Sequence, residues 1–164
     1  MSASKASRIP ALGPRGEGWF LLQLALIVAV VVSAMTLTLP VDDGTGRAAM
    51  LVGFIVLVGG LGVFGLGIAT LGSSLSPLPK PLESAQLIER GIYRFIRHPI
   101  YTGLVLAAAG GSIYAVSPLA GLFTVALAVV LDLKARREEI WLAQRYPGYA
   151  DYARRTRKFV PGIY

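Results

Sequence analysis

The sequence predicts an all-α integral membrane protein, and three observations point to this fold class. Hydrophobic residues make up 54% of the 164 residues and charged residues only 15%, and the mean hydropathy of +0.62 lies outside the range of ordinary soluble domains. Two apolar runs, residues 19–39 and 48–71, are each long enough to cross a bilayer as a helix, which takes about 20 residues. Basic residues gather in the segments that flank the apolar runs. We therefore expect one membrane domain over residues 1–164 with four transmembrane helices.

The first two helices are expected within residues 19–71, after a cytoplasmic N-terminal tail at residues 1–18. The tail carries Lys5, Arg8 and Arg15. The apolar run that follows is too long for the core of a signal peptide and ends without an obvious small-residue cleavage site. We therefore expect the first helix to be retained.

Glycines are frequent in the second apolar run. The spacing of Gly60, Gly62 and Gly65 formally matches the dinucleotide-binding fingerprint G-x-G-x-x-G. That fingerprint works only between a strand and the N-terminus of a helix, whereas these glycines lie inside an apolar span. We expect them instead to let neighbouring helices approach closely, within the monomer or between copies.

The third and fourth helices are expected as a tilted helical hairpin within residues 72–164, which also hold a cofactor-binding loop and a C-terminal extension. Residues 100–116 and 119–133 are apolar, but each run is shorter than a comfortable membrane span. Ser117 and Pro118 separate the two runs and predict a tight break between helices.

The basic residues predict the orientation, because Lys and Arg near helix ends are retained on the cytoplasmic side. They lie before the first helix, between the second and third, and after the fourth, whereas only Arg47 falls in an opposite loop. This places both termini in the cytoplasm and makes the chain a multi-pass protein of the cytoplasmic (inner) membrane or an equivalent one. The net charge of +7 then reflects topology and attraction to the anionic headgroups of membrane lipids. Binding of nucleic acid is the weaker interpretation.

Cysteine is absent from the sequence, which excludes disulfides, thiolate nucleophiles and cysteine-based metal sites. His98 is the single histidine. A histidine-rich metal centre is therefore not expected.

The first polar segment, residues 73–101, contains the proline-rich stretch 77–81, which cannot form a regular helix and is expected to run extended along the membrane surface. Gly91 permits a turn, and Pro99 suits the first turn of the third helix. His98 then lies at the N-terminus of that helix, where backbone N–H groups and the helix dipole favour an anion. Arg97 and His98 could add donors to such an anion, or could anchor lipid headgroups.

The second polar segment, residues 132–142, follows the fourth apolar run. Its adjacent carboxylates, Glu138 and Glu139, could hold ribose hydroxyls or complement a bound cation. The alternative is a solvated helix face with ion pairs such as Arg136 to Glu139, which stabilise a helix only slightly. Pro147 and the glycine after it are expected to end this helix.

Together the two segments resemble a known superfamily of membrane enzymes. The pattern is Gly91-Ile92-Tyr93, then Arg97-His98-Pro99-Ile100-Tyr101-Thr102-Gly103, an apolar hairpin, Glu138-Glu139, and a tail with Tyr149, Tyr152 and Pro161. It is similar to the isoprenylcysteine carboxyl methyltransferase and phospholipid methyltransferase superfamily. The resemblance covers residues 85–162, and the first two helices match only as apolar spans.

This resemblance implies S-adenosylmethionine as methyl donor, in a pocket between the loop before the third helix and the extension of the fourth. Carried over residue by residue, it gives a set of cofactor-binding positions: Gln86, Leu87, Ile88, Tyr93, His98, Pro99, Ile100, Tyr101, Glu138 and Glu139. Four residues before Glu138, the isoprenylcysteine enzymes carry an arginine that meets the substrate carboxylate. This sequence has Lys134 there, which supplies charge but not the arginine fork. Arg137 is a possible substitute, so Lys134 and Arg137 are the candidate catalytic residues.

The side chains of the two polar segments also favour methyl transfer on chemical grounds, independently of the resemblance. A sulfonium donor is already activated, so the protein mainly has to align the acceptor and exclude water. A carboxylate acceptor, as on an isoprenylcysteine, needs no general base. A phospholipid amine would need one, and Glu138 or Glu139 could serve. The expected acceptor is a lipophilic small molecule or a lipid-modified group.

Two other classes stay open. The C-terminal pattern through residues 159–164 is also similar to the membrane sterol reductases, which use NADPH and are much larger. A non-catalytic membrane scaffold or small transporter subunit would bind no cofactor and would tolerate changes at His98 and Glu138.

Overall fold

The computed structural model describes residues 9–80 and 85–160, and within them the chain is built from helices and connecting segments. The four long helices are α2 (Glu17–Thr36), α3 (Asp43–Leu71), α4 (Pro99–Tyr114) and α5 (Pro118–Arg145). Shorter elements join and follow them: η1 (Gly72–Ser74), η2 (Gly91–Arg94) and α6 (Tyr149–Arg155). The predictions that concern Lys5, Arg8, Pro81 and residues 161–164 lie outside the described residues.

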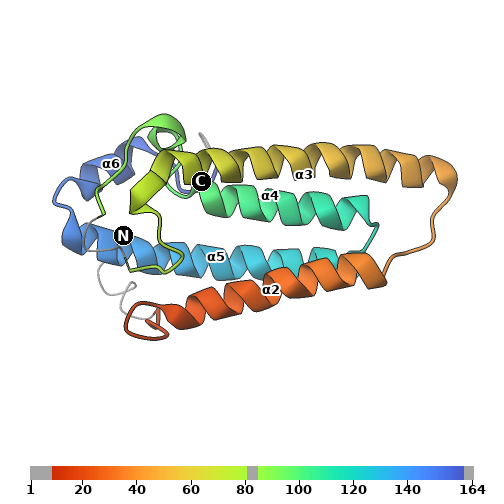
Figure 1. Cartoon of the computed structure of the whole chain (residues 1–164), viewed down its shortest axis with the longest axis horizontal. Coiled ribbons are helices and arrows are strands. Elements are labelled where there is room, and N and C mark those ends of the chain that lie inside the picture. Colours follow the sequence, from red (N-terminus) through yellow and green to blue (C-terminus); the bar gives the residue numbers. More distant parts are fainter. Residues whose placement is uncertain (1–8, 81–84, 161–164) are drawn as a thin grey trace.

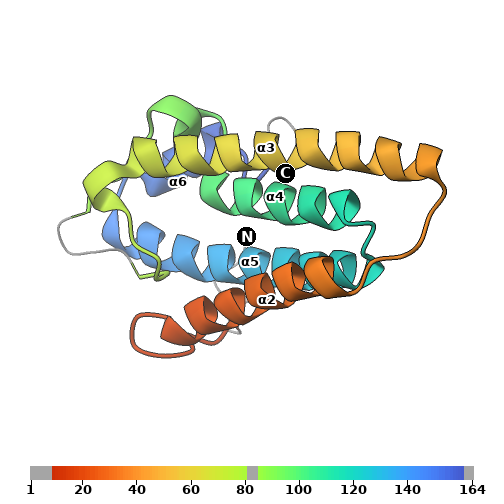
Figure 2. The same ribbon diagram turned by 45° about the vertical axis from the view of Figure 1, so that its right-hand side comes forward.

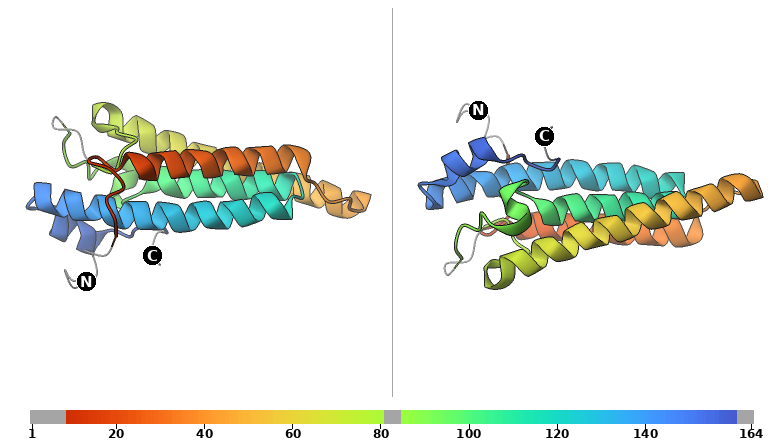
Figure 3. Two further views of the ribbon diagram at one scale, coloured as in Figure 1. Left: turned by 90° about the horizontal axis from the view of Figure 1, so that it is seen from below. Right: turned by 90° about the horizontal axis from the view of Figure 1, so that it is seen from above.

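The long helices run side by side along the long axis of the molecule, with α6 and η2 at one end (Figure 1). Helix α3 lies along α4 and helix α2 along α5, and these are the most extensive contacts of the bundle. Figure 2 shows the same two pairs with α6 behind α3. Seen from above and below, α3 crosses the bundle obliquely and its N-terminal end extends beyond the ends of α4 and α5 (Figure 3).

Length and composition confirm an all-α integral membrane protein. Among the described residues, α2, α5 and the stretch Asp43–Ser74 are long and apolar enough to cross a membrane, whereas α4 is a shorter apolar helix. Large apolar side chains face outward, for example Leu51 at 63% and Val125 at 63% exposure. Such surfaces are unusual in a soluble monomer but are what lipid chains cover in a bilayer.

The observed helix boundaries differ from the predicted ones for local reasons. Helix α3 begins at Asp43, five residues before the apolar run, because the Asp42 side chain caps it by accepting from Thr45 N at 3.0 Å. Helix α2 ends at Thr36, before the predicted residue 39, and an extended segment follows. Helix α5 continues without a break from the apolar run through the second polar segment and ends at Arg145, which confirms the predicted end before Pro147.

Helices α4 and α5 form the predicted hairpin of consecutive helices joined by a tight turn, and α4 packs more extensively on α3 than on α5. Glycines allow this close approach: a Cβ on Gly60 would lie 2.4 Å from Ala107 N, and one on Gly103 would lie 2.4 Å from Phe64 N. The packing interpretation of the glycine motif therefore holds for Gly60. Gly62 and Gly65 make no such contact within the described monomer, since nothing lies within 4 Å of a Cβ added to either.

The two ends of the bundle differ in character. One end holds residues 37–42 and the turn at 115–117, where Ser117 Oγ lies 2.6 Å from Leu37 O and ties α2 to the start of α5. The opposite end gathers residues 72–80 and 85–98, the last turns of α5, and α6. Within the described residues, the predicted basic segments lie at this second end, whereas Arg47 belongs to the start of α3.

Candidate functional site

A cavity of about 450 Å³ lies at this polar end of the bundle. Its walls come from every long helix, from the loop that precedes η2, and from α6. The residues that line it include Phe20 and Gln23 of α2; Phe64 and Ile68 of α3; Ser74–Leu78 and Ala85–Ile88 of the connecting loop; Tyr93, His98, Ile100 and Tyr101; Lys134, Glu138 and Leu142 of α5; and Tyr146, Tyr149 and Tyr152. The volume falls in the range of small-molecule sites, ~300–1,000 Å³.

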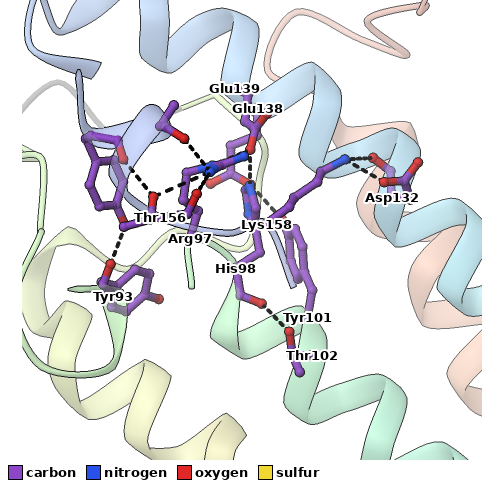
Figure 4. Close-up of polar contacts among 12 residues, drawn as sticks. Tyr93, Arg97, His98, Tyr101, Thr102, Asp132, Glu138, Glu139, Thr156 and Lys158 are labelled. Carbon is purple, nitrogen blue, oxygen red and sulfur yellow. Dashed lines mark hydrogen bonds and ion pairs between the residues drawn. The ribbon is translucent and has the colours of Figure 1, made fainter. Parts of the chain in front are cut away.

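Tyr101 and Glu138 join α4 to α5 at the cavity wall. The Tyr101 hydroxyl donates to Glu138 Oε2 at 2.8 Å. The His98 ring stacks on the Tyr101 ring with the centroids 5.3 Å apart, and His98 Nδ1 lies 3.8 Å from Glu138 Oε2 (Figure 4). These contacts fix the direction of the Glu138 carboxylate while leaving it at the cavity.

The second carboxylate of the pair has a different environment. Glu139 Oε1 accepts from Arg97 Nε at 2.9 Å and lies 3.2 Å from His98 Nε2. Arg97 Nη1 also donates to the carbonyls of Ala153 at 3.0 Å and Thr156 at 2.6 Å. The predicted anion at the start of the third helix is therefore the protein's own Glu139. The expected pairing of Arg136 with Glu139 does not position this carboxylate, since Arg136 Nη2 lies 2.7 Å from Asp132 Oδ2.

The segment after α6 holds the backbone that precedes α4. Arg97 N donates to Arg157 O at 2.8 Å and His98 N to Lys158 O at 3.1 Å, beside an isolated parallel bridge between residues 96 and 157. Lys158 Nζ lies 2.5 Å from Asp132 Oδ1 on α5 (Figure 4). Burial lowers the pKa of Lys158, and the Asp132 carboxylate opposes this effect. The segment after α6 thus holds the backbone of Arg97 and His98 in position.

Lys134 is almost fully buried, at 1% exposure, and it lies at the cavity. Its ammonium donates to Gln23 Oε1 at 2.6 Å and to Pro77 O at 3.0 Å, and lies 5.1 Å from the centre of the Tyr101 ring. Arg137 is placed differently. Its guanidinium lies over the Trp141 ring at 4.5 Å, and the residue is not among those that line the cavity.

Tyrosines of η2 and α6 close the cavity from outside the bundle. The Tyr152 hydroxyl donates to Tyr93 O at 2.8 Å. Burial raises the pKa of Tyr93, Tyr149 and Tyr152 above the ordinary tyrosine value. The buried Tyr149 hydroxyl has no hydrogen-bond partner within the described residues, although it belongs to a cavity-lining side chain. A buried hydroxyl in this state is suited to a polar group of a bound molecule.

The structure brings most of the predicted site residues together. Those that line the one cavity are Gln86, Leu87, Ile88, Tyr93, His98, Ile100, Tyr101, Lys134 and Glu138. Pro99 is buried at the first turn of α4, and Glu139 acts on Arg97 and His98. Sequence reasoning missed the contributions of α2 and α3. For Gln23 a signal existed, because it is the single polar side chain between Trp19 and Val32.

A partly polar cavity of this size at one end of a helical membrane bundle is suited to binding a small or lipophilic molecule. The family model described as phospholipid methyltransferase matches residues 48–148. The chain therefore belongs to the phospholipid methyltransferase family. The matched region contains α4, nearly all of α3 and all of α5, but not α2.

Curated relatives carry two kinds of name. The nickel-cobalt-cadmium resistance protein NccN of Alcaligenes xylosoxydans xylosoxydans is 30% identical over 63% of this chain and 49% of its own length. The cobalt-zinc-cadmium resistance protein CzcN of Cupriavidus metallidurans matches to the same extent. A probable protein-S-isoprenylcysteine O-methyltransferase of Oryza sativa is 29% identical over 68% of this chain and 61% of its own length. The chain thus spans about half the length of the resistance proteins it matches.

Proposed function

We propose that the protein transfers a methyl group from S-adenosylmethionine to the carboxylate of a lipophilic acceptor. One observation carries the proposal: Glu138 and Lys134, one helical turn apart on α5, line the same cavity. A carboxylate and an ammonium on one wall provide a place for a cationic donor and a place for an anionic acceptor.

The donor end of the cavity is the part near Glu138. Its carboxylate, the Tyr149 hydroxyl and the backbone of Leu87 and Ile88 would hold the hydroxyl, amino and adenine groups of S-adenosylmethionine, with His98 beside them. The chemistry that this cofactor supplies is a methyl group on a sulfonium sulfur, which a nucleophile can take directly. Glu139 holds His98 in place, and the described tyrosines keep water from this end.

The acceptor end is the part near Lys134. Phe20, Phe64 and Ile68 provide apolar walls from helices that themselves face lipid, so a lipophilic acceptor would enter sideways from the bilayer. The Lys134 ammonium attracts a carboxylate and repels a protonated amine. A carboxylate is already a nucleophile at neutral pH and needs no general base, which favours this acceptor over a phospholipid amine. The positive-inside pattern supports a cytoplasmic position for the cavity and both termini.

The names of the metal-resistance relatives do not lead us to propose metal transport or binding. Across residues 9–80 and 85–160, no group of three or more His, Cys, Asp or Glu side chains could hold a metal ion. We therefore relate the chain to the methyltransferase chemistry of its family.

The test is calorimetric titration of the detergent-purified protein with S-adenosylhomocysteine, with NADPH in a parallel cell. We expect saturable binding of the first ligand only. Glu138→Gln should weaken it by about 10- to 100-fold, the usual worth of a hydrogen bond to a charged group. Asp43→Asn, an exposed carboxylate at the opposite end of the bundle, is the matched control and should leave affinity unchanged.

The acceptor is tested separately with radiolabelled S-adenosylmethionine. An N-acetyl-S-prenylcysteine should be labelled and phosphatidylethanolamine vesicles should not. Lys134→Ala should reduce labelling while S-adenosylhomocysteine still binds. Binding of NADPH alone, or of neither ligand, would refute the proposed function, and labelling of the vesicles alone would refute the acceptor class.

A further inference from the structure

We infer that Gln23 of α2 is a specificity-determining residue that, together with Lys134, forms a two-donor site for the acceptor carboxylate. This inference rests on the proposed function and deepens it. Gln23 lies outside the family-matched residues 48–148, so the site is a property of this chain's first helix.

The orientation of the Gln23 amide follows from its partner. A lysine ammonium can only donate, so the group that faces Lys134 Nζ at 2.6 Å has to be the amide oxygen. The amide nitrogen is then turned away from the ammonium. It makes no hydrogen bond within the described part of the chain, although Gln23 lines the cavity. Two donor hydrogens of Gln23 are therefore available to a ligand.

The Lys134 ammonium also has a donor hydrogen that makes no hydrogen bond within the described residues. It has three donor hydrogens, and two point to Gln23 Oε1 and Pro77 O. The third remains for the cavity beside the Tyr101 ring. The groups that hold this nearly fully buried ammonium are neutral oxygens, and the carboxylate that acts on it, Glu138, accepts from the Tyr101 hydroxyl. An acceptor carboxylate in direct contact would therefore stabilise the buried charge further.

The combined donors suit a planar carboxylate. An arginine binds a carboxylate through two parallel N–H groups, and a lysine alone cannot do so. The Gln23 amide hydrogen-bonded to Lys134 supplies the second donor next to the first. The amide also orients the ammonium. Gln23 and Lys134 together therefore supply the two donors that an arginine at position 134 would supply.

The position of a half-buried glutamine in this helix supports a role beyond packing. Between Trp19 and Val32 every other side chain of α2 is apolar. A polar side chain in a membrane helix is retained where it bonds to another helix or serves a site. Gln23 bonds to another helix through Lys134 of α5. The hydrogens of its amide nitrogen are available to a ligand.

The test compares an acid with its methyl ester. Binding of an N-acetyl-S-prenylcysteine and of its ester is measured calorimetrically in saturating S-adenosylhomocysteine, with kcat and KM for the acid measured in parallel. Gln23→Met, which keeps length and flexibility, should weaken the acid about tenfold and leave the ester within about twofold, because one hydrogen bond to a charged group is lost. The KM should rise with kcat nearly unchanged.

Two further variants make the test specific. Gln23→Glu places the protein's own carboxylate against Lys134 and should abolish acid binding while the ester and S-adenosylhomocysteine still bind. Gln23→Met combined with Lys134→Arg should restore the preference for acid, since arginine brings its own second donor. Thr36→Val, a polar-to-apolar change at the far end of α2, is the control and should change nothing.

The outcomes separate the two proposals. If the wild-type protein methylates the acid but Gln23→Met keeps the wild-type ratio of acid to ester affinity, the inference is wrong and the proposed function stands. If the arginine double variant does not recover the acid preference, the two-donor account is wrong. If the wild-type protein binds S-adenosylhomocysteine but does not prefer acid to ester, both the inference and the carboxylate acceptor fall.

Discussion

The contact between α3 and α4 predicts that a Gly→Ala change has opposite effects on stability at two adjacent residues, Gly59 and Gly60. Gly60 faces α4, where an added Cβ would lie 2.4 Å from Ala107 N, while nothing in the described structure lies within 4 Å of a Cβ on Gly59. The same Gly→Ala change at the two positions has the same intrinsic effect on the helix. The difference between them therefore reports the helix contact alone.

The magnitude follows from the geometry. An ordinary van der Waals contact begins at 3.4 Å, so Ala at position 60 has to push the helices apart by roughly 3.4 − 2.4 = 1.0 Å. The obstacle is backbone, which cannot rotate away. Overpacking of this kind typically costs about 1–3 kcal/mol. Ala at position 59 should be neutral or stabilising by up to about 1 kcal/mol, because alanine is the better helix former.

Thermal unfolding in detergent measures the effect on stability, and titration with S-adenosylhomocysteine measures the effect on the site. For a chain of this length, ~1 kcal/mol corresponds to a shift in Tm of ~2–4 °C, so we expect Gly60→Ala to lower Tm by about 2–12 °C. It should also weaken ligand binding, because the displaced helices carry Phe64 and Tyr101 at the cavity. Equal shifts in Tm for Gly59→Ala and Gly60→Ala would refute the packing argument.

Two predictions concern the polar end. Glu139→Gln should destabilise the fold by about 1–3 kcal/mol, because Arg97 and His98 lose a charged acceptor while Arg97 keeps its carbonyl partners; an unchanged Tm would contradict this role. The raised pKa values of Tyr93 and Tyr152 mean that above about pH 10 the unfolded state loses protons that the folded state retains, so stability should fall with rising pH. In Tyr152→Phe the slope of Tm against pH over that range should be shallower, and an unaltered slope would show that this tyrosine does not contribute.

The sequence predicted the membrane class and the polar segments because these depend on local composition. A bilayer requires long apolar runs, and a proline at position 99 begins a helix in almost any context. Helix pairing could also have been predicted in part. Gly53, Gly60 and Gly67 repeat every seven residues, as do Gly103 and Gly110, and these are the glycines whose added Cβ atoms would meet the opposite helix or its side chains.

Other features depend on tertiary contacts that composition does not encode. Arg97 was expected at the surface or beside a ligand, but it is held by Glu139 and by carbonyls nearly sixty residues away. Lys134 was expected to meet substrate directly, and its bonds to Gln23 and Pro77 could not be predicted without the position of α2. The cavity itself joins the four long helices, α6 and the loop before η2, so no single segment carries its pattern.

The pairing of residues 95–98 with residues 157–158 has a consequence for biosynthesis. During translation, the backbone that carries His98 leaves the ribosome well before its pairing partners are made. Helices α2 to α5 can enter the membrane in sequence, but Arg97 and His98 acquire their final hydrogen bonds only when the residues after α6 emerge. A nascent chain arrested after α5 would thus have its long helices inserted but would lack the hydrogen bonds that hold Arg97 and His98 at the site.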